Sequence, residues 1–411
     1  MSALRKVLLY SHDTYGLGHL RRNLAIARYL LRNQPGIQVV LVSGSTVADR
    51  FSLPSGLKVV QLPPVVKVGV DEYAARDGQL SLALVRRARS AVISDVVRRW
   101  RPDVFLVDHA PQGMKGELMP VFRALGKHSP STRVVLGLRD ILDEPARVRS
   151  TWEADGVYDT LDLVYDRIFV YGSPEVSDVV TEYGIEGPAL QRLSYCGYVA
   201  AEAPPKCSLP PGLQEGEPFV LGTVGGGADG ARVLEATLRA AAELSVRPVV
   251  VTGPLMAAPD RAELIALAGQ VPGAVIVEHL PELPAVAMAA RCIVTRGGYN
   301  SLCELAPLGV PTIVVPRSWP RREQVLRAEA FAQRGLVEVV EEHQEETDAF
   351  QSRLAAAIGR ALQAPLYIGG ESLDLGGLSR LTEGLVETCS SPKAAPGLGS
   401  EEDSKLVGAA L

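Results

Sequence analysis

The segment RGGYNSLCELAPLGVPTIVVP, residues Arg296–Pro316, decides the fold. It follows the strand-like run RCIVT (Arg291–Thr295) and ends in a second strand-like run, PTIVVP (Pro311–Pro316), with a short helix-like run between them. A buried strand, a glycine-rich turn, a helix and another buried strand form the repeating unit of a parallel sheet covered by helices. The turn has two interpretations, a phosphate-binding site or simply a tight connection between strand and helix.

The same alternation extends over most of the chain. Helical patterns cover His19–Asn33 and Gln79–Trp100. Strand-like runs lie at Lys6–Tyr10, Ile37–Ser43, Asp103–Asp108, Arg133–Leu138 and Arg167–Gly172, and again at Pro218–Gly225, Arg247–Gly253, Gly273–Glu278, Arg291–Thr295 and Thr312–Pro316. Strands that are apolar throughout indicate parallel sheets with both faces covered. We therefore predict an α/β protein with two doubly wound, Rossmann-like domains that face each other across a cleft.

Changes in composition predict the domain boundaries. The stretch AEAPPKCSLPPGLQEGEP, residues 201–218, is rich in proline and glycine and has no apolar period, which is typical of a linker. Residues 1–200 are then the amino-terminal domain and residues 219–389 the carboxyl-terminal domain. The stretch after Cys389 also lacks apolar periodicity, so residues 390–411 are predicted to be a disordered tail.

Composition excludes several classes of protein. A net charge of −5 argues against a dedicated nucleic-acid binder. Five cysteines without C-x-x-C spacing favour reduced thiols over a disulfide framework or a zinc site. The amino terminus becomes polar too early for a signal peptide, and no run of about 18 apolar residues occurs, so we expect a cytoplasmic protein without a transmembrane segment. The arginine clusters at Arg86–Arg89 and Arg98–Arg101 are predicted to lie on a solvated helix face, with a basic patch for an anionic acceptor or membrane surface as the alternative.

A histidine and an aspartate follow two strands of the predicted amino-terminal sheet. In YSHDTYGLGHLRRN, Gly18 loosens the turn and His19 falls at the start of the helix, where it could act as a general base or simply begin the helix. Asp108 ends another strand, so both residues emerge at the carboxyl edge of the sheet. Asp108 could orient the imidazole of His19 or cap the following turn.

Two glycine-rich turns in the second half are candidate phosphate sites. Gly225 and Gly226 follow a strand in LGTVGGGADG and let a ligand approach the backbone, although the turn is neither a P-loop nor a complete dinucleotide fingerprint. The opening segment adds Gly298, Asn300 and Ser301, whose amides and side chains converge at the start of a helix. Alone, each turn also fits a purely structural connection.

Acidic and amide side chains lie where they could bind the rest of a nucleotide-sugar. Glu304 is one helical turn beyond Ser301, a position suited to a pair of ribose hydroxyls. Glu323 and Gln324 follow the next strand at the same sheet edge and could bind sugar hydroxyls, or form a solvated helix start.

These residues carry a family resemblance. RGGYNSLCE, followed by PLGVPTIVVP and EQ, resembles the donor-binding signature of nucleotide-sugar glycosyltransferases of the GT-B fold, both the plant-type UDP-glycosyltransferases and the MurG-like enzymes that add N-acetylglucosamine to a lipid-linked acceptor. The resemblance implies that Asn300 and Ser301 bind the diphosphate, that Glu304 binds the ribose, and that Glu323 and Gln324 bind the donor sugar.

The resemblance also implies a reaction. GLGHLRR and LVDHAP are similar to the segments that carry the catalytic His and its Asp in these enzymes, so His19 would be the general base and Asp108 would hold it. Arg296 replaces the plant-type His and would neutralise the diphosphate. The transfer would need no metal, in line with the lack of an Asp-x-Asp motif in the sequence. It would need no cofactor, because the nucleotide-sugar, preferably a UDP-sugar, is a co-substrate. The amino-terminal domain would bind the acceptor, which is lipid-linked, a polysaccharide or a small molecule, and peripheral membrane contact stays open.

Two other functions are compatible with these residues. A nucleotide-sugar 2-epimerase or hydrolase would use the same two-domain fold with a different reaction. A degenerate member that only binds a nucleotide-sugar or a partner protein would lack turnover altogether. Incubation with a nucleotide-sugar in the absence of any acceptor discriminates transfer from epimerisation and hydrolysis.

Overall fold

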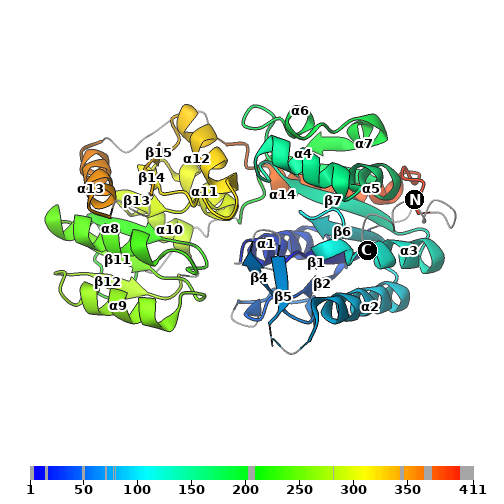
Figure 1. Cartoon of the computed structure of the whole chain (residues 1–411), viewed down its shortest axis with the longest axis horizontal. Helices are drawn as coiled ribbons and strands as arrows, with labels where there is room; N and C mark the ends of the chain where they lie inside the picture. The colour runs from blue at the N-terminus through cyan, green and yellow to red at the C-terminus, as the bar shows by residue number, and fades with distance from the viewer. Residues whose placement is uncertain are drawn as a thin grey trace. The chain divides into compact units, whose positions relative to one another are not determined.

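The structure is a computed structural model in which two compact units are resolved, Met1–Val199 with Asp374–Leu411 (unit 1) and Ala200–Leu373 (unit 2). Each unit has its own sheet with helices packed on it (Figure 1). The residues described are 4–13, 17–48, 51–69, 72–76, 78, 80–201, 209–280, 282–342, 347–364 and 373–398.

Unit 1 contains a parallel sheet with the strand order β3-β2-β1-β6-β7-β8-β9. The strands are β1 (Lys6–Ser11), β2 (Gln38–Ser43), β3 (Leu57–Gln61), β6 (Val104–Asp108), β7 (Arg133–Arg139), β8 (Arg167–Tyr171) and β9 (Leu193–Tyr195). The helices are α1 (Gly18–Asn33), α2 (Leu82–Trp100), α3 (Met119–His128), α4 (Pro145–Ala154), α5 (Val157–Val164), α6 (Val179–Tyr183) and α7 (Gly187–Gln191). An antiparallel hairpin of β4 (Val65–Gly69) and β5 (Glu72–Ala75) lies outside this sheet and was not predicted.

Unit 2 repeats the arrangement with the strand order β12-β11-β10-β13-β14-β15. The strands are β10 (Phe219–Thr223), β11 (Arg247–Val251), β12 (Val275–Val277), β13 (Cys292–Thr295), β14 (Thr312–Val314) and β15 (Glu338–Val339). The helices are α8 (Ala231–Glu243), α9 (Ala258–Ala268), α10 (Leu283–Met288), α11 (Tyr299–Leu305), α12 (Glu323–Gln333) and α13 (Thr347–Gln363). The prediction of two doubly wound α/β domains is confirmed.

In each sheet, the direction in which the chain adds strands reverses at one pair of neighbouring strands. In unit 1 the chain builds outward from β1 in one direction and then continues from β6 in the other, and in unit 2 β10 and β13 have the same relation. Ligands of doubly wound sheets bind outside the carboxyl ends of the strands at this switch point. Within each pair the strands end level, because Tyr10 is opposite Val107 and Thr223 is opposite Thr295. The turns that follow them therefore start side by side.

The carboxyl-terminal boundary differs from the prediction. Helix α14 (Gly377–Ser390) packs against α1, β7 and β8 of unit 1, with the side chains of Leu381 and Leu385 fully buried (Figure 1). The guanidinium of Arg380 donates to the backbone oxygen of Cys196 at 2.7 Å. Unit 2 thus ends at Leu373, and the prediction that residues 219–389 form one domain is wrong at its carboxyl end.

The predicted disordered tail is ordered in part. The backbone amides of Ala394 and Ala395 donate to the carboxylate of Asp166 at 2.9 and 3.1 Å, and the Gly397 amide donates to the Leu163 oxygen at 2.8 Å. Because the contacts are made by backbone amides, the side chains of this segment need no apolar periodicity, and the sequence pattern could not predict the order. Residues 399–411 of that prediction, and residues 202–208 of the predicted linker, lie outside the described residues.

The prediction of a solvated arginine face on α2 fails at one position. Arg98 and Arg99 do lie on the surface, where both pair with Asp95. Arg89 is fully buried instead, and its guanidinium pairs with the equally buried carboxylate of Glu117 at 2.6 Å. The cluster therefore spans two faces of the helix.

Candidate active site

The switch point of unit 1 brings His19 and Asp108 into contact. His19 lies in the first turn of α1, and Asp108 is the last residue of β6. His19 Nδ1 is 2.6 Å from Asp108 Oδ2, while the side chain of Asp108 is fully buried and that of His19 is 14% exposed. A carboxylate oxygen this close to a ring nitrogen requires a proton between them, so Nδ1 carries it. The other nitrogen, Nε2, then keeps its lone pair.

Arg22 completes this group and was missed by the sequence prediction. Its Nε donates to Asp108 Oδ1 at 2.9 Å and its Nη2 donates to Asp108 Oδ2 at 2.8 Å, a bidentate pair that is almost fully buried. Arg22 lies three residues after His19, on the same helix face. That spacing in HLRR could have identified it. Gly18, the predicted loosening glycine, is the first residue of α1.

The electrostatics of the pair favour a neutral imidazole. Burial lowers the pKa of His19, and this outweighs the opposing effect of the Asp108 carboxylate. Burial alone would raise the pKa of Asp108, but the charge of Arg22 and the hydrogen bond from His19 hold it below its ordinary value. At neutral pH the site thus contains an ionised aspartate and a neutral histidine, the protonation states of a base and the group that orients it.

The switch point of unit 2 brings the two predicted phosphate turns together. A Cβ atom on Gly225, which follows β10, would lie 3.7 Å from Ser301 Oγ, in the turn that follows β13. Gly225 has a φ of 63°, a left-handed conformation that favours glycine. Behind it, a Cβ on Gly227 would lie 2.1 Å from the backbone oxygen of Thr252, so this turn packs directly against the turn after β11. Only glycine fits there.

The predicted diphosphate and ribose residues lie on one short helix. Gly298 precedes α11, and Asn300, Ser301 and Glu304 are all within it, each less than 9% exposed. Gly226 follows Gly225 in the turn after β10. The backbone oxygen of Gly226 accepts a hydrogen bond from the Leu255 amide at 2.8 Å. The two glycine-rich turns thus meet, and the turn after β11 packs against the first of them.

The predicted sugar-binding pair joins the same group. A Cβ on Gly297 would lie 3.1 Å from the Cβ of Gln324, so the start of α12 contacts the turn after β13. Gln324 Oε1 accepts from the Arg317 amide at 3.1 Å, which leaves the amide nitrogen of Gln324 as the donor. Glu323 Oε1 accepts from Arg317 Nη2 at 3.0 Å, and Oε2 has no hydrogen-bond partner among the described residues.

Arg317 connects the turns and was not predicted. Besides Glu323, its guanidinium contacts Asp229 Oδ2 at 3.1 Å, in the turn that follows β10. Its position directly after the predicted strand that ends in Pro316 was the available signal, since such positions lie at the carboxyl edge of the sheet.

Arg296 differs from its predicted role. Its Nη1 pairs with Glu342 at 2.6 Å and donates to the Val315 oxygen at 3.2 Å, and its Nη2 donates to the Asp229 oxygen at 2.5 Å. The charge expected to neutralise a diphosphate is therefore paired inside the protein. Arg296 instead joins the turn after β10, the residue after β14 and Glu342, because an arginine with five donors can contact several segments at once.

Comparison with known proteins finds one family model that matches part of the chain. Residues 223–367 match the model of the glycosyltransferase family 28 C-terminal domain. This match covers both glycine-rich turns and both predicted sugar-binding residues. The chain has the GT-B fold. The family 28 match lies within unit 2.

Curated relatives match over short segments. The chain is 38% identical over 63 residues to the UDP-N-acetylglucosamine--N-acetylmuramyl-(pentapeptide) pyrophosphoryl-undecaprenol N-acetylglucosamine transferase of Shouchella clausii, which covers 15% of this chain and 18% of that protein. It is 33% identical over 102 residues to the protein of the same name from Parasynechococcus marenigrum, which covers 24% and 28%. These segments span less than a third of the relatives' length.

Solved structures match over nearly the whole chain at low identity. The calicheamicin glycosyltransferase CalG4 has a TM-score of 0.58 at 16% identity and covers 98% of both chains. MurG of Acinetobacter baumannii has a TM-score of 0.55 at 13% identity and covers 93% of this chain and 99% of its own. A UDP-N-acetylglucosamine 2-epimerase has a TM-score of 0.60 at 14% identity and covers 97% and 100%. At these identities the likeness establishes the fold.

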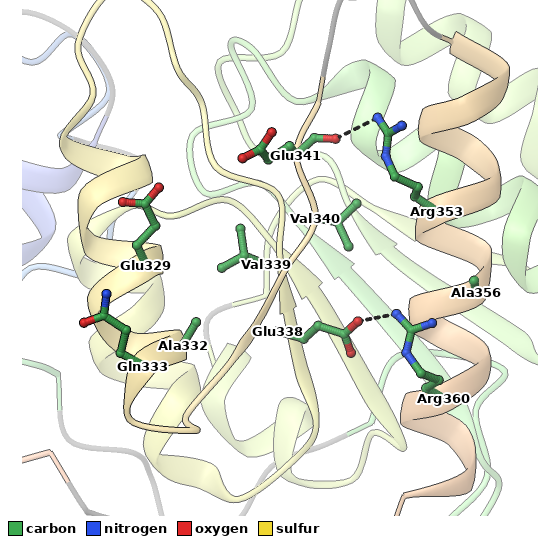
Figure 2. A pocket seen from close by; sticks show the side chains of 10 residues that line it. All are labelled: Glu329, Ala332, Gln333, Glu338, Val339, Val340, Glu341, Arg353, Ala356 and Arg360. Atoms are coloured by element: carbon green, nitrogen blue, oxygen red, sulfur yellow. Dashed lines mark hydrogen bonds and ion pairs between the residues drawn. The ribbon is translucent and has the colours of Figure 1, made fainter.

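The family 28 domain also has a cavity of about 720 Å³ away from the converging turns. It lies beside β15, between α12 and α13 (Figure 2). Glu338 and Arg360 form an ion pair across it, and Arg353 donates to the backbone oxygen of Glu341 at 3.3 Å. None of the predicted donor residues lines this cavity, so it is separate from the site described above.

Two buried thiols lie outside the site described above. Burial raises the pKa of Cys196 and of Cys292 to about 12, so both thiols stay protonated at neutral pH. Cys207 lies outside the described residues. Within the described part of the chain, no group of three or more His, Cys, Asp or Glu side chains has an arrangement that could hold a metal ion. Nor does any described helix combine the length and the apolar character needed to cross a bilayer.

Proposed function

We propose that this protein transfers a sugar from a nucleoside diphosphate donor, preferably a UDP-sugar, to a hydroxyl group of an acceptor. The observation that carries the proposal is the 2.6 Å contact between His19 and Asp108 at the switch point of unit 1, in a chain whose unit 2 carries a family 28 domain. The chemistry of a base and its orienting carboxylate supports group transfer to a hydroxyl.

In the proposed reaction, His19 Nε2 takes the proton of the acceptor hydroxyl. The acceptor oxygen forms a bond to the anomeric carbon while the bond from that carbon to the diphosphate breaks, and the nucleoside diphosphate leaves. Asp108 holds the ring through Nδ1 and stabilises the imidazolium as it forms. Arg22 balances the charge of Asp108 in the resting enzyme and fixes both of its oxygens.

Unit 2 would hold the donor. The backbone at Gly225 and Gly226 and the side chains of Asn300 and Ser301 would contact the diphosphate. Supporting this, Gly225 lies beside Ser301 Oγ where the turns after β10 and β13 meet, and Asn300 belongs to the same short helix as Ser301. Such fixed donors stabilise a leaving diphosphate without a metal ion, so we propose metal-independent transfer. Glu304 would bind the ribose hydroxyls, and Glu323 with the amide nitrogen of Gln324 would bind the sugar.

The test is incubation with UDP-N-acetylglucosamine, the donor named for the curated relatives, with and without an acceptor. Transfer predicts that release of UDP depends on the acceptor and yields one glycoside per UDP. Epimerases have TM-scores as high as the transferases, so the fold does not separate the two reactions. The family 28 match favours transfer. Rapid formation of the 2-epimer or of free sugar without acceptor would contradict it.

The pH dependence of the reaction should follow the protonation of His19. A base must be neutral, so kcat/KM is expected to fall as the pH drops through the pKa of His19. Because burial lowers that pKa, the midpoint should lie below the ordinary imidazole value of about 6.5. The check is a pH–rate profile from pH 4.5 to 8.5, with protein stability followed in parallel. A midpoint above 7 would show that another group controls the reaction.

Glu304 is expected to determine the affinity for the donor. Glu304→Ala removes charged hydrogen bonds to the ribose, each worth about 1.5–3 kcal/mol, and should raise the donor KM at least about tenfold. The acceptor KM should stay within about twofold. A suitable control is Glu329→Ala, which removes a carboxylate at the cavity beside β15. Equal effects of the two substitutions on the donor KM would contradict the assignment.

A further inference from the structure

A buried tyrosine contacts the arginine of the His19–Asp108 group. Tyr171 is the last residue of β8 and is fully buried. The Cζ atom of the Arg22 guanidinium is 5.6 Å from the centre of the Tyr171 ring, within the range of a cation–π contact. Because Arg22 is the cation that pairs with Asp108, the tyrosine ring supports the group that balances the charge of the aspartate.

A glycine in the neighbouring strand makes room for this ring. Gly137 is in β7, where it is paired with Asp108 of β6. A Cβ atom on Gly137 would lie 1.8 Å from Tyr171 Oη and 2.2 Å from Tyr171 Cζ, so the ring lies directly against the backbone of Gly137. A glycine inside a strand often marks such a close approach. The ring therefore extends from β8 over β7, the strand next to Asp108.

The ring of Tyr171, and not its hydroxyl, makes the contact with Arg22. Tyr171 Oη is buried and has no hydrogen-bond partner in the part of the chain that the structure describes. Burial raises the pKa of Tyr171 well above its ordinary value, and the Asp108 carboxylate adds to the rise. The hydroxyl is therefore neutral and adds no charge to the site. A phenylalanine ring should support Arg22 in the same way.

The position of Arg22 matters because its charge acts on two groups. Nε and Nη2 donate to the two oxygens of Asp108 at 2.9 and 2.8 Å, which keeps the carboxylate ionised. Nη2 also lies 3.1 Å from His19 Nδ1, where its positive charge disfavours the imidazolium. The side chain of Arg22 is only 1% exposed, so little water screens either effect.

Several titratable and charged groups surround His19. Those that contact it or interact with it electrostatically in the described part of the chain are His12, Asp13, Arg22, Asp108, His109 and Arg139. Burial lowers the pKa of His19, Asp108 raises it, and Arg22 and Arg139 lower it further. A substitution that leaves all six residues in place can therefore change the pKa of His19 only by moving them or by admitting water.

We propose that Tyr171 is a positioning residue for the general base. Its ring, packed on Gly137, holds the guanidinium of Arg22 against Asp108 and beside His19, so that the imidazole stays neutral until the acceptor hydroxyl gives up its proton. Tyr171 acts through Arg22 and not on the reacting atoms. The inference rests on the proposed function, which gives His19 its role as base.

The first test measures the pKa of His19 by NMR titration and does not need activity. Tyr171→Met fills the space with a flexible chain but removes the ring, so the guanidinium should move away and water should enter. Both changes should raise the pKa of His19, whose signal is assigned by its loss in His19→Ala. Tyr171→Phe keeps the ring and should titrate like the wild type. Tyr165→Met, the same change at another fully buried tyrosine of unit 1, should also leave the pKa of His19 unchanged.

A second variant displaces the ring without removing it. In Gly137→Ala the new Cβ would overlap Tyr171 Oη and Cζ, so the ring must move away from its place beside Arg22. The pKa of His19 should rise as it does in Tyr171→Met. The double variant Gly137→Ala, Tyr171→Met should show no further rise, because no ring remains to be displaced. Either single variant decides the inference if the other does not fold.

The outcomes separate this inference from the proposed function. An unchanged pKa of His19 in folded Tyr171→Met or Gly137→Ala, or an equal rise in Tyr171→Phe or Tyr165→Met, would overturn the role of Tyr171 alone. In the transfer reaction, the midpoint of the pH–rate profile should move upward in Tyr171→Met together with the pKa of His19. A midpoint that stays in place while that pKa rises would contradict His19 as the base, and the titration would still show that Tyr171 positions Arg22.

Discussion

His19→Ala is expected to lower the rate of sugar transfer by about two to four orders of magnitude, the usual contribution of a general base. Of the two side chains that pair with Asp108 in the described part of the chain, the imidazole is the one that can take a proton at neutral pH, because Arg22 remains charged. Donor affinity should be unchanged, since the donor residues belong to unit 2. Steady-state rates combined with calorimetric donor binding provide the measurement.

The matched control for this prediction is His128→Ala, at the exposed end of α3. It removes an imidazole from the same unit without touching the switch point, so activity should stay within about twofold. Turnover by His19→Ala at more than a tenth of the wild-type rate would remove His19 as the base. Loss of donor binding in His19→Ala would also contradict the division of roles between the units.

Arg89→Met is expected to destabilise unit 1 by about 3–5 kcal/mol. The substitution leaves the carboxylate of Glu117 buried and without its cation, and an uncompensated buried charge is strongly unfavourable. Tyr10 would lose its fixed acceptor geometry as well, because it shares Glu117 Oε1 with Arg89. Urea denaturation followed by fluorescence measures the change in the free energy of unfolding.

The control is Arg98→Met, on the same helix, whose partner Asp95 is exposed. Surface pairs contribute little to stability, so its urea midpoint should be indistinguishable from that of the wild type. The double variant Arg89→Met, Glu117→Leu should recover part of the loss, since no unpaired charge remains. Equal urea midpoints for Arg89→Met and Arg98→Met would show that the buried pair of Arg89 and Glu117 does not stabilise the fold.

The fold was predictable because its strands are apolar over their whole length. Runs such as VVLVS and DVFLVD are buried on both faces, and this pattern is typical of a parallel sheet. The domain boundary was not predictable in the same way. The amphipathic pattern of helix α14 predicts that one face is buried, but it does not identify the partner. The partners include β7 and β8, which lie more than 200 residues earlier in the chain.

The site was predictable where it depends on strand order and not where it depends on side-chain direction. His19 and Asp108 each follow from a position at the carboxyl edge of one sheet, and the two glycine-rich turns of unit 2 and the Glu323–Gln324 pair follow from the same rule. Arg296 shows the limit of this rule. It stands at the expected edge, yet its side chain points to Glu342, which lies 46 residues later and has no local signal.

The most direct test of the central claim, that unit 2 seats a nucleoside diphosphate at its converging turns, is a calorimetric titration of the protein with UDP. We predict saturable binding of one UDP per chain, weakened at least about tenfold by Glu304→Ala and unchanged by His19→Ala. No saturable binding of UDP or any other nucleoside diphosphate, or binding that Glu304→Ala leaves intact while His19→Ala abolishes it, would contradict the account.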